Sequence, residues 1–302
     1  MIVLGIDAGA SSTRWLLQAE TGQELAQGKL GPLTGHIFKE DDRLENRARL
    51  DQLIRDVLAA GKPGAVAIGM TGLHPGTEAA RFYETALQTA FALEARHVEL
   101  SNDMHIAYAS VFEPGEGVLA YAGTGAVGYH ETEAGVVLRS GGYGYLIDDA
   151  GAGYWIGHEG IKQVMRWVDE TGQVATQVLA QVIYDDVGST VWPEIMEVIY
   201  GGGRSRVAAL APKVALAAKQ GDEAALEILE RAGQELARLA NCILGRLGKA
   251  LPVTFAGGIS RLSPVLTQSL ERSLKAHTAF KVESGEPVQA AAKLAFKLLQ
   301  KT

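Results

Sequence analysis

Two glycine-punctuated hairpin patterns constrain the fold of this chain more than any other feature of its sequence. In the first, the apolar run 2–6 leads into a Gly/Ser/Thr turn at 9–13, and an alternating segment returns over 15–19. In the second, the apolar run 118–122 leads into Gly-Thr-Gly at 123–125, followed by another short strand. Turns of this kind expose backbone N–H groups that no side chain covers, which suits them to phosphate oxygens. Two copies predict a duplicated core that closes on one nucleotide.

The length of the chain favours two domains over one core. It has 302 residues, and a typical domain has about 100–200. The Pro114-Gly115 pair is the best boundary, which predicts an N-terminal domain over 1–112 and a C-terminal domain over 113–302. Whether the last helix packs back on the N-terminal domain is left open.

Hydrophobic spacing predicts strands that alternate with helices in both halves, which indicates layered α/β domains. In the first half we expect strands near 2–7, 13–19, 24–30, 65–70 and 98–100, and helices near 42–60, 77–92 and 104–112. In the second half we expect strands within 117–139, then mainly helices, with a clear helix at 222–249, a strand at 252–256, and helices from 263 and over 287–300.

Charge and cysteine content exclude several classes of protein. The formal net charge of -7 argues against a nucleic-acid partner, which needs a basic face. Cys242 is the only cysteine, so this chain forms no internal disulfide and no thiolate-built zinc or iron–sulfur site. We expect Cys242 to be a small buried residue of an apolar helix. The chain opens on a strand rather than a charged leader, and no segment reaches the ~20 apolar residues of a membrane span, so we expect a cytoplasmic protein.

Two glycine motifs imitate nucleotide sites and are rejected. Residues 123–128 match the dinucleotide fingerprint G-x-G-x-x-G, but the fingerprint requires a helix directly after it. Here the next residues read as strand, turn and strand, so the dipole of a helix N-terminus is missing. Residues 22–29 resemble a P-loop, but the spacing is one residue too long, and Leu30 stands where Ser or Thr should hold magnesium.

Two aspartates end predicted strands, and each has a structural and a chemical interpretation. Asp7 is either a turn residue bonded to its own backbone or an acid that holds hydrated Mg²⁺ against phosphates, since Mg²⁺ prefers one or two carboxylates plus phosphate oxygens. Asp103 is either a helix N-cap or a general base at the carboxyl end of a strand, where α/β sites collect. An ordinary Asp has a pKa of ~3.9 and is ready to accept a hydroxyl proton at neutral pH.

The segment 141–157 is dense in glycine and closes with aromatic residues. It is either an irregular loop with Tyr154 and Trp155 in the core, or a loop whose two carboxylates, Asp148 and Asp149, bond sugar hydroxyls. His158-Glu159 does not extend to a second histidine and is not a zinc motif. With the other histidines scattered, we expect no metal other than Mg²⁺.

Taken together, these motifs resemble the sugar kinases of the actin, Hsp70 and hexokinase superfamily. More narrowly, the chain resembles the N-acetylglucosamine kinase group of the BadF/BadG/BcrA/BcrD-type ATPases, over nearly its whole length. The resemblance rests on a phosphate-1 loop at 5–14, a connecting segment at 101–103, a phosphate-2 loop at 122–125, a sugar loop at 141–152 and an adenosine motif at 256–259.

The resemblance implies two α/β domains of actin-like ATPase (ribonuclease H-like) fold around a central cleft. It implies transfer of a phosphoryl group from Mg²⁺-ATP to a sugar hydroxyl, with Asp103 as the catalytic base, Asp7 holding Mg²⁺ through water, and domain closure that excludes water. Nucleotide contacts are expected from Asp7, Gly9, Ser11, Ser12, Thr13, Gly123, Thr124, Gly257 and Gly258. Sugar contacts are expected from Thr71, Asn102, Asp103, Thr124, Gly125, Gly141, Gly142 and Asp149.

The sequence departs from the family pattern in three places. The family's G-D-E-G reads Asp-Asp-Ala-Gly at 148–151, so one carboxylate is lost and another is gained nearby. The family's T-N-H-W reads Thr-Gly-His-Ile at 34–37, and Gln289 stands where Gly is usual. The first change bears on sugar recognition, because losing a hydrogen bond to a substrate hydroxyl changes selectivity strongly.

Several alternatives stay open from the sequence. The sugar is N-acetylglucosamine or a relative such as glucosamine or glucose. A second hypothesis is an ATPase activator that drives electrons into a partner enzyme, although its bridging cluster needs cysteines in a loop. A third is a sugar sensor or an actin-like filament protein. On base rates, we expect a homodimer that forms through the helical second domain.

Overall fold

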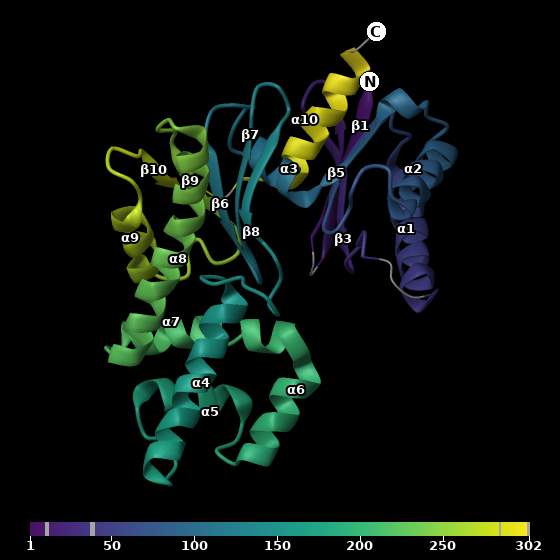
Figure 1. Cartoon of the computed structure of the whole chain (residues 1–302). Coiled ribbons are helices and arrows are strands. Elements are labelled where there is room, and N and C mark those ends of the chain that lie inside the picture. The colour runs from purple at the N-terminus through teal and green to yellow at the C-terminus, as the bar shows by residue number, and fades with distance from the viewer. Residues whose placement is uncertain (10–11, 37–39, 284, 301–302) are drawn as a thin grey trace. The chain divides into compact units, whose positions relative to one another are not determined.

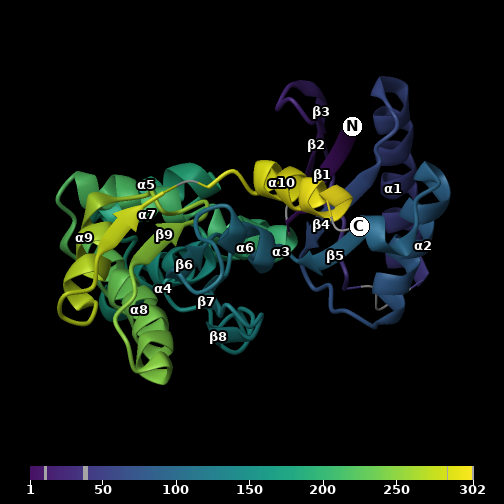
Figure 2. The same cartoon turned by 90° about the horizontal axis from the view of Figure 1, so that it is seen from above.

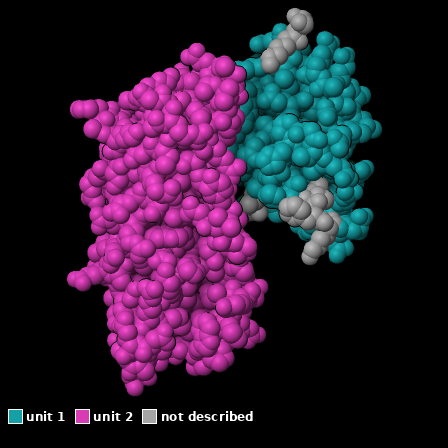
Figure 3. Space-filling model, viewed as in Figure 1, with its two compact units in different colours: residues 1–112, 285–302 teal, residues 113–284 magenta. Residues whose placement is uncertain are grey.

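The computed structural model describes residues 1–9, 12–36, 40–283 and 285–300, and the chain forms two compact units (Figure 3). Unit 1 comprises residues 1–112 and 285–302, and unit 2 comprises residues 113–284. Each unit contains one five-stranded sheet with helices packed on it. The α/β class predicted from the sequence is confirmed.

Unit 1 begins with a three-stranded antiparallel meander and continues with parallel strands (Figure 1). The spatial order of its sheet is β3-β2-β1-β4-β5. The strands are β1 (Ile2–Ala8), β2 (Thr13–Ala19), β3 (Glu24–Leu30), β4 (Ala65–Met70) and β5 (Val98–Asn102). The helices are α1 (Glu40–Ala60), α2 (Glu78–Phe91), α3 (Asp103–Ala109) and α10 (Pro287–Gln300), with a 3₁₀ turn η1 (Ala95–His97).

Both faces of the unit 1 sheet are covered, and the alternation of its strands decides which residues face which helices. Leu4 and Ile6 of β1 share one cluster with Leu50 and Leu53 of α1. Val3 shares the opposite cluster with residues of α10. Figure 2 shows the two sets of helices on opposite sides of these strands. Unit 1 is therefore a three-layer α/β/α structure.

Helix α10 belongs to unit 1, although it follows all of unit 2 in the sequence. Its buried residues Ala292, Ala295 and Leu298 pack against Val3 and Leu16 of the sheet. The helix begins with Pro287, whose fixed φ suits the first helical turn. The last helix thus packs back on the first unit.

Unit 2 repeats the strand pattern of unit 1 and adds a large helical part. Its sheet has the order β10-β9-β6-β7-β8, again an antiparallel meander followed by parallel strands. The strands are β6 (Val118–Ala122), β7 (Ala126–Glu131), β8 (Val137–Gly141), β9 (Val253–Ala256) and β10 (Phe280–Val282). The helices are α4 (Gly153–Thr171), α5 (Val178–Val187), α6 (Trp192–Ala208), α7 (Ala211–Lys219), α8 (Glu223–Leu247) and α9 (Pro264–Ser273). The two sheets therefore share one topology, as the paired hairpins predict.

Helix α8 packs its apolar face on the sheet of unit 2 and on α9. Cys242 is exposed, so the expectation that it is buried is wrong. It lies four residues after Arg238 and seven after Glu235, on the polar face, whereas the neighbouring Ile243 is buried. In the described ranges, no helix is both long enough and apolar enough to cross a membrane.

Candidate active site

The carboxyl ends of three parallel strands of unit 1 bring its predicted site residues together. Asp7 of β1 pairs in register with Gly69 of β4, and Met70 of β4 pairs with Asn102 of β5. Thr71 and Asp103 follow directly after β4 and β5. Parallel strands deliver the residues that follow them to one edge of the sheet, where ligands of α/β proteins bind. Residues separated by almost a hundred positions in the sequence thus share one edge.

Asp7 sits in an environment that disfavours its charge. Burial raises the pKa of Asp7 to about 6, and the Asp103 carboxylate acts in the same direction, while the Arg14 guanidinium opposes both. Two carboxylates close enough to affect each other's titration attract a cation or a shared proton. This is the opposite of a turn aspartate that is stabilised by its own backbone.

Asp103 is the first residue of α3, but it does not cap that helix. The cap is Asn102, whose Oδ1 accepts a hydrogen bond from the Met104 N–H at 3.0 Å. Asp103 instead accepts a hydrogen bond from the Thr71 hydroxyl, with 2.6 Å between Oγ1 and Oδ2. That distance is typical of a charge-assisted O–H···O⁻ bond. The capping interpretation therefore applies to Asn102 and not to Asp103. Asn102 was predicted to contact the sugar, but its Oδ1 already bonds to the backbone of α3.

The turns of both hairpins are closed by their own first glycine. In unit 1 the Gly9 N–H donates to the Ser12 carbonyl at 3.1 Å, and in unit 2 the Gly123 N–H donates to the Gly125 carbonyl at 2.9 Å. These two N–H groups therefore bond to backbone carbonyls of their own turns rather than to side chains. The bonds follow from hairpin geometry, because the glycine N–H faces the returning strand. Ser11 lies outside the described residues.

Thr13 differs from its predicted role as a phosphate contact. Its side chain is fully buried, and its Oγ1 accepts a hydrogen bond from the Leu33 N–H at 2.8 Å. A buried hydroxyl that already satisfies a backbone N–H serves the loop after β3, and a phosphate has no access to it. The sequence could not reveal this, because Thr13 and Leu33 meet only in the folded sheet.

The phosphate-2 turn at 123–125 lies against a helix N-terminus. Strand β7 follows the turn directly, as expected, so the dinucleotide fingerprint is a coincidence of letters. However, the first N–H groups of α4 reach the turn: Gly153 N–H donates to the Gly123 carbonyl at 2.9 Å, and Tyr154 N–H donates to the Thr124 carbonyl at 3.2 Å. The expectation that this turn has no helix N-terminus beside it is therefore wrong, because the helix arrives through tertiary packing.

The adenosine motif packs on the same turn region. Gly257 has a φ of +104°, and a Cβ there would lie 2.3 Å from the Ala122 carbonyl oxygen. Only glycine fits such a conformation and such a close approach. The Ile259 N–H donates to the Ala122 carbonyl at 3.2 Å, and Gly258 is exposed. The adenosine motif and the phosphate-2 turn thus lie in direct contact within unit 2.

Asp149 is buried beside the same turn. It is 3% exposed, and its Oδ1 accepts a hydrogen bond from the Ala126 N–H at 3.3 Å. Burial raises the pKa of Asp149, against the opposing Ala126 N–H and Arg204 guanidinium. Its φ of +77° lies in the left-handed region that aspartate tolerates better than most residues.

Arg204 is a site residue that sequence reasoning missed. Its Nη2 lies 3.2 Å from Asp149 Oδ2, and its guanidinium lies over the Tyr145 ring at 5.3 Å from the centroid. Both Asp149 and Arg204 lie close against Gly125. The only sequence signal was the glycine run 201–203, where Gly203 leaves the helical conformation just before Arg204. Gly141 ends β8 and Gly142 follows it, and the carbonyls of both accept hydrogen bonds from the Arg139 guanidinium.

Two curated proteins are similar to this chain over most of its length. An N-acetylmuramic acid/N-acetylglucosamine kinase of Clostridium acetobutylicum is 29% identical over 269 residues, which is 85% of each chain. An N-acetyl-D-glucosamine kinase of Dictyostelium discoideum is 26% identical over 294 residues, 90% of each chain.

Solved structures share the fold. A Chromobacterium violaceum protein, provisionally assigned as an N-acetylglucosamine kinase, superposes with a TM-score of 0.72 at 24% identity, over 97% of this chain and 98% of that one. A ROK-family glucokinase of Streptomyces griseus gives 0.55 at 15% identity, over 98% and 100%. The actin-like ATPase fold predicted from the motifs is confirmed. A family model matches residues 4–286, and this chain belongs to the BadF/BadG/BcrA/BcrD ATPase family.

Proposed function

We propose that this chain is an ATP-dependent sugar kinase that phosphorylates a hydroxyl of N-acetylglucosamine or a closely related amino sugar, with Asp103 as the general base. The observation that carries the proposal is the pairing of Asp103 with the Thr71 hydroxyl, beside Asp7, at the carboxyl ends of the parallel strands of unit 1. The two curated relatives, named as kinases of N-acetylated amino sugars, support the substrate class.

In the proposed reaction, the Asp103 carboxylate accepts the proton of the sugar hydroxyl. The sugar oxygen then forms a bond to the γ-phosphorus of ATP as the bond between that phosphorus and the β,γ-bridging oxygen breaks. The products are a sugar phosphate and ADP. Because the transition state of such transfers is loose, positioning and electrostatic stabilisation supply most of the rate, so the orientation of Asp103 matters more than its basicity.

The acidic residues of unit 1 fit a divalent cation. Burial and the Asp103 charge both penalise an ionised Asp7, and a nearby cation would offset both effects. We propose that Asp7 holds hydrated Mg²⁺, which would neutralise charge on the phosphate oxygens of ATP. Nucleotide contacts are proposed for the turn that follows Asp7, for Thr124 and for Gly257 and Gly258, and sugar contacts for Thr124, Gly125, Gly142 and Asp149.

An ADP-release assay tests the proposal. Purified protein with Mg²⁺-ATP is offered N-acetylglucosamine, N-acetylmuramic acid, glucosamine, N-acetylmannosamine and glucose in turn. We expect stimulation by at least one N-acetylated amino sugar, with the phosphorylated product identified by mass spectrometry. Stimulation by none of the five would overturn the sugar-kinase proposal.

Asp103→Asn tests the base. We expect this variant to lose about 10²–10⁴-fold in kcat, the usual contribution of a general base, while it keeps its nucleotide affinity in calorimetry. Asp56→Asn is the matched control, because Asp56 is an exposed carboxylate of α1 in the same unit. An Asp103→Asn protein with most of its sugar-dependent turnover would show that another group takes the proton.

A further inference from the structure

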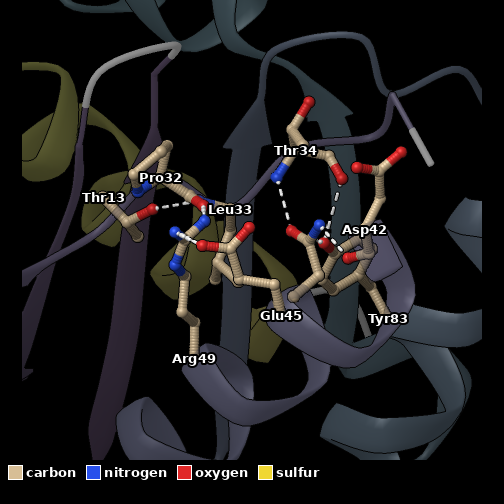
Figure 4. A network of polar contacts seen from close by, with 9 residues as sticks. Thr13, Pro32, Leu33, Thr34, Asp42, Glu45, Arg49 and Tyr83 are labelled. Carbon is tan, nitrogen blue, oxygen red and sulfur yellow. Dashed lines mark hydrogen bonds and ion pairs between the residues drawn. The ribbon is translucent and has the colours of Figure 1, made fainter. Parts of the chain in front are cut away.

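A buried polar pair contacts the loop 31–36 that follows β3, and the site described above does not include this pair. Asn46 of α1 is 2% exposed and Tyr83 of α2 is fully buried. The Tyr83 hydroxyl lies 2.9 Å from Asn46 Oδ1 and 3.0 Å from the Thr34 carbonyl. Figure 4 shows Tyr83 pointing toward Thr34. A polar group this deeply buried destabilises the fold unless it forms hydrogen bonds, so the hydrogen-bond partners of Asn46 and Tyr83 are fixed.

The orientation of the Asn46 amide follows from its partners. Its Nδ2 donates to the Asp42 carbonyl at 2.7 Å, so its Oδ1 must face the loop, where it accepts a hydrogen bond from the Thr34 N–H at 3.0 Å. A second hydrogen bond from α1 holds the same loop two residues before Thr34. The Arg49 Nη1 donates to the Pro32 carbonyl at 2.6 Å (Figure 4). Helix α1 therefore fixes the loop at two points, Pro32 and Thr34.

The loop in turn holds Thr71. The Gly35 N–H donates to the Thr71 carbonyl at 2.9 Å, and the Thr34 hydroxyl donates to the same oxygen at 3.3 Å. On the other side, the Thr71 N–H donates to the carbonyl of Ala8, the residue after Asp7, at 2.9 Å. The backbone of Thr71 is thus fixed between the loop and β1, and its hydroxyl is left to donate to Asp103.

We propose that Thr71 is a positioning residue for Asp103, and that the buried Asn46–Tyr83 pair acts on Asp103 through the loop and Thr71. A hydroxyl donates one proton, so the bond to Oδ2 sets the rotation of the Asp103 carboxylate. This inference rests on the proposed function. It also differs from the expectation that Thr71 contacts the sugar, because a residue that aims the base changes kcat, whereas one that binds sugar changes KM.

Three variants test the proposal in the sugar-dependent ADP-release assay. Thr71→Val removes the hydroxyl at nearly constant shape, and we expect kcat to fall by up to about 100-fold, the cost of a misplaced reacting group, with the KM for sugar little changed. Thr71→Ser keeps the donor and should restore turnover well above that of Thr71→Val. Tyr83→Phe removes one hydroxyl at a distance and should lower kcat about 2- to 10-fold, as expected for one hydrogen bond.

A double variant tests whether the pair acts through Thr71. If it does, Tyr83→Phe added to Thr71→Val lowers kcat no further than Thr71→Val alone, because the two changes interrupt one chain of contacts. Additive losses would overturn that part of the proposal. Asn46→Ala supplies a second probe of the pair, and Gln52→Ala, an exposed position of the same helix, is its control. Should Asn46→Ala fail to fold, Tyr83→Phe decides the question.

The outcomes separate this inference from the proposed function. A wild-type protein that transfers phosphoryl groups to no sugar overturns the function. An active wild type with unchanged kcat in Thr71→Val overturns the inference and leaves the function standing. A raised KM with unchanged kcat would assign Thr71 to sugar binding. Nucleotide affinity and circular dichroism of each variant establish that the fold is intact.

Discussion

The charge of a single residue, Asp7, links the site of unit 1 to the stability of the protein. Its pKa of about 6 in the folded state lies above its ordinary value. Between pH 4 and pH 6 the folded state therefore binds more protons than the unfolded state, so the contribution of Asp7 to stability falls as pH rises through this window. Above it, the ionised carboxylate remains a constant penalty.

We predict that Asp7→Asn stabilises the fold at pH 7.5 by at most about 3 kcal/mol, since the amide carries no charge to desolvate. The gain should shrink as pH falls through 6 and should vanish near pH 4, where the wild-type carboxyl is already protonated. Urea unfolding across this range measures the effect. Asp56→Asn is the exposed control, and a gain for Asp7→Asn that is the same at pH 4 and pH 7.5 would contradict the buried-charge explanation.

The role of a residue could be predicted where it depends only on the position of that residue relative to its own strand or helix. Asp103 follows directly after β5, and its place at the sheet edge could be inferred from spacing alone. The Thr71–Asp103 bond joins residues 32 positions apart, so it depends on which strands become neighbours. Thr13 was expected at a phosphate and is buried under the loop after β3, and Cys242 was expected in the core and is exposed. Both depend on which face of a strand or helix is covered by another part of the chain, and residue type and local pattern do not reveal this.

At the scale of elements, the contact between α10 and β1 is unusually close. A Cβ at Gly5 would lie 2.4 Å from the Ala292 backbone nitrogen and 2.6 Å from the Val288 carbonyl oxygen. Those atoms belong to the helix backbone and cannot move aside without moving the helix. Gly5 is thus the residue that lets α10 approach the sheet.

We predict that Gly5→Ala destabilises unit 1 by about 1–3 kcal/mol, the usual cost of overpacking. Urea unfolding followed by circular dichroism measures the loss. Gly201→Ala is the control, because a Cβ there meets no atom within 4 Å. A Gly5→Ala midpoint equal to that of the wild type would show that α10 is free to shift.

Elements with a strong local pattern were predictable, and those defined by a partner were not. The hairpins, α1, α8 and α10 were expected at nearly their observed positions, because their apolar periods are clear. The short strand β10 was missed, since three residues carry no period and it exists through pairing with β9. The helices α4 to α7 were expected only as a helical region, without bounds. Arg204 was missed with them.

At the scale of the molecule, unit 1 is built from two distant parts of the chain, whereas unit 2 is continuous. Unit 2 has one large hydrophobic cluster of its own. Unit 1 needs α10 to cover Val3, Leu16, Ala65 and Ala67 on one face of its sheet. The two units should therefore behave differently when they are expressed separately.

We predict that a fragment of residues 113–284 unfolds cooperatively on heating, whereas a fragment of residues 1–112 does not. A peptide of residues 285–302 added to the shorter fragment should restore cooperative unfolding, because it supplies the missing apolar face. Differential scanning calorimetry measures each case, and a peptide with Leu298→Asp is the control. Cooperative unfolding of 1–112 without any peptide would contradict the role assigned to α10.

The return of α10 to unit 1 also sets the order of events while the chain is being synthesised. A domain usually folds once its last residue leaves the ribosome, which favours the N-terminal domain. Here unit 1 begins first but is complete only after α10 has been synthesised, whereas unit 2, which begins later, is complete before α10. The strand that carries Asp7 and the helix that carries Asp103 thus remain uncovered on one side until α10 has been synthesised. A truncated product made by premature termination anywhere before α10 would carry a finished unit 2 at most, joined to an unfinished unit 1.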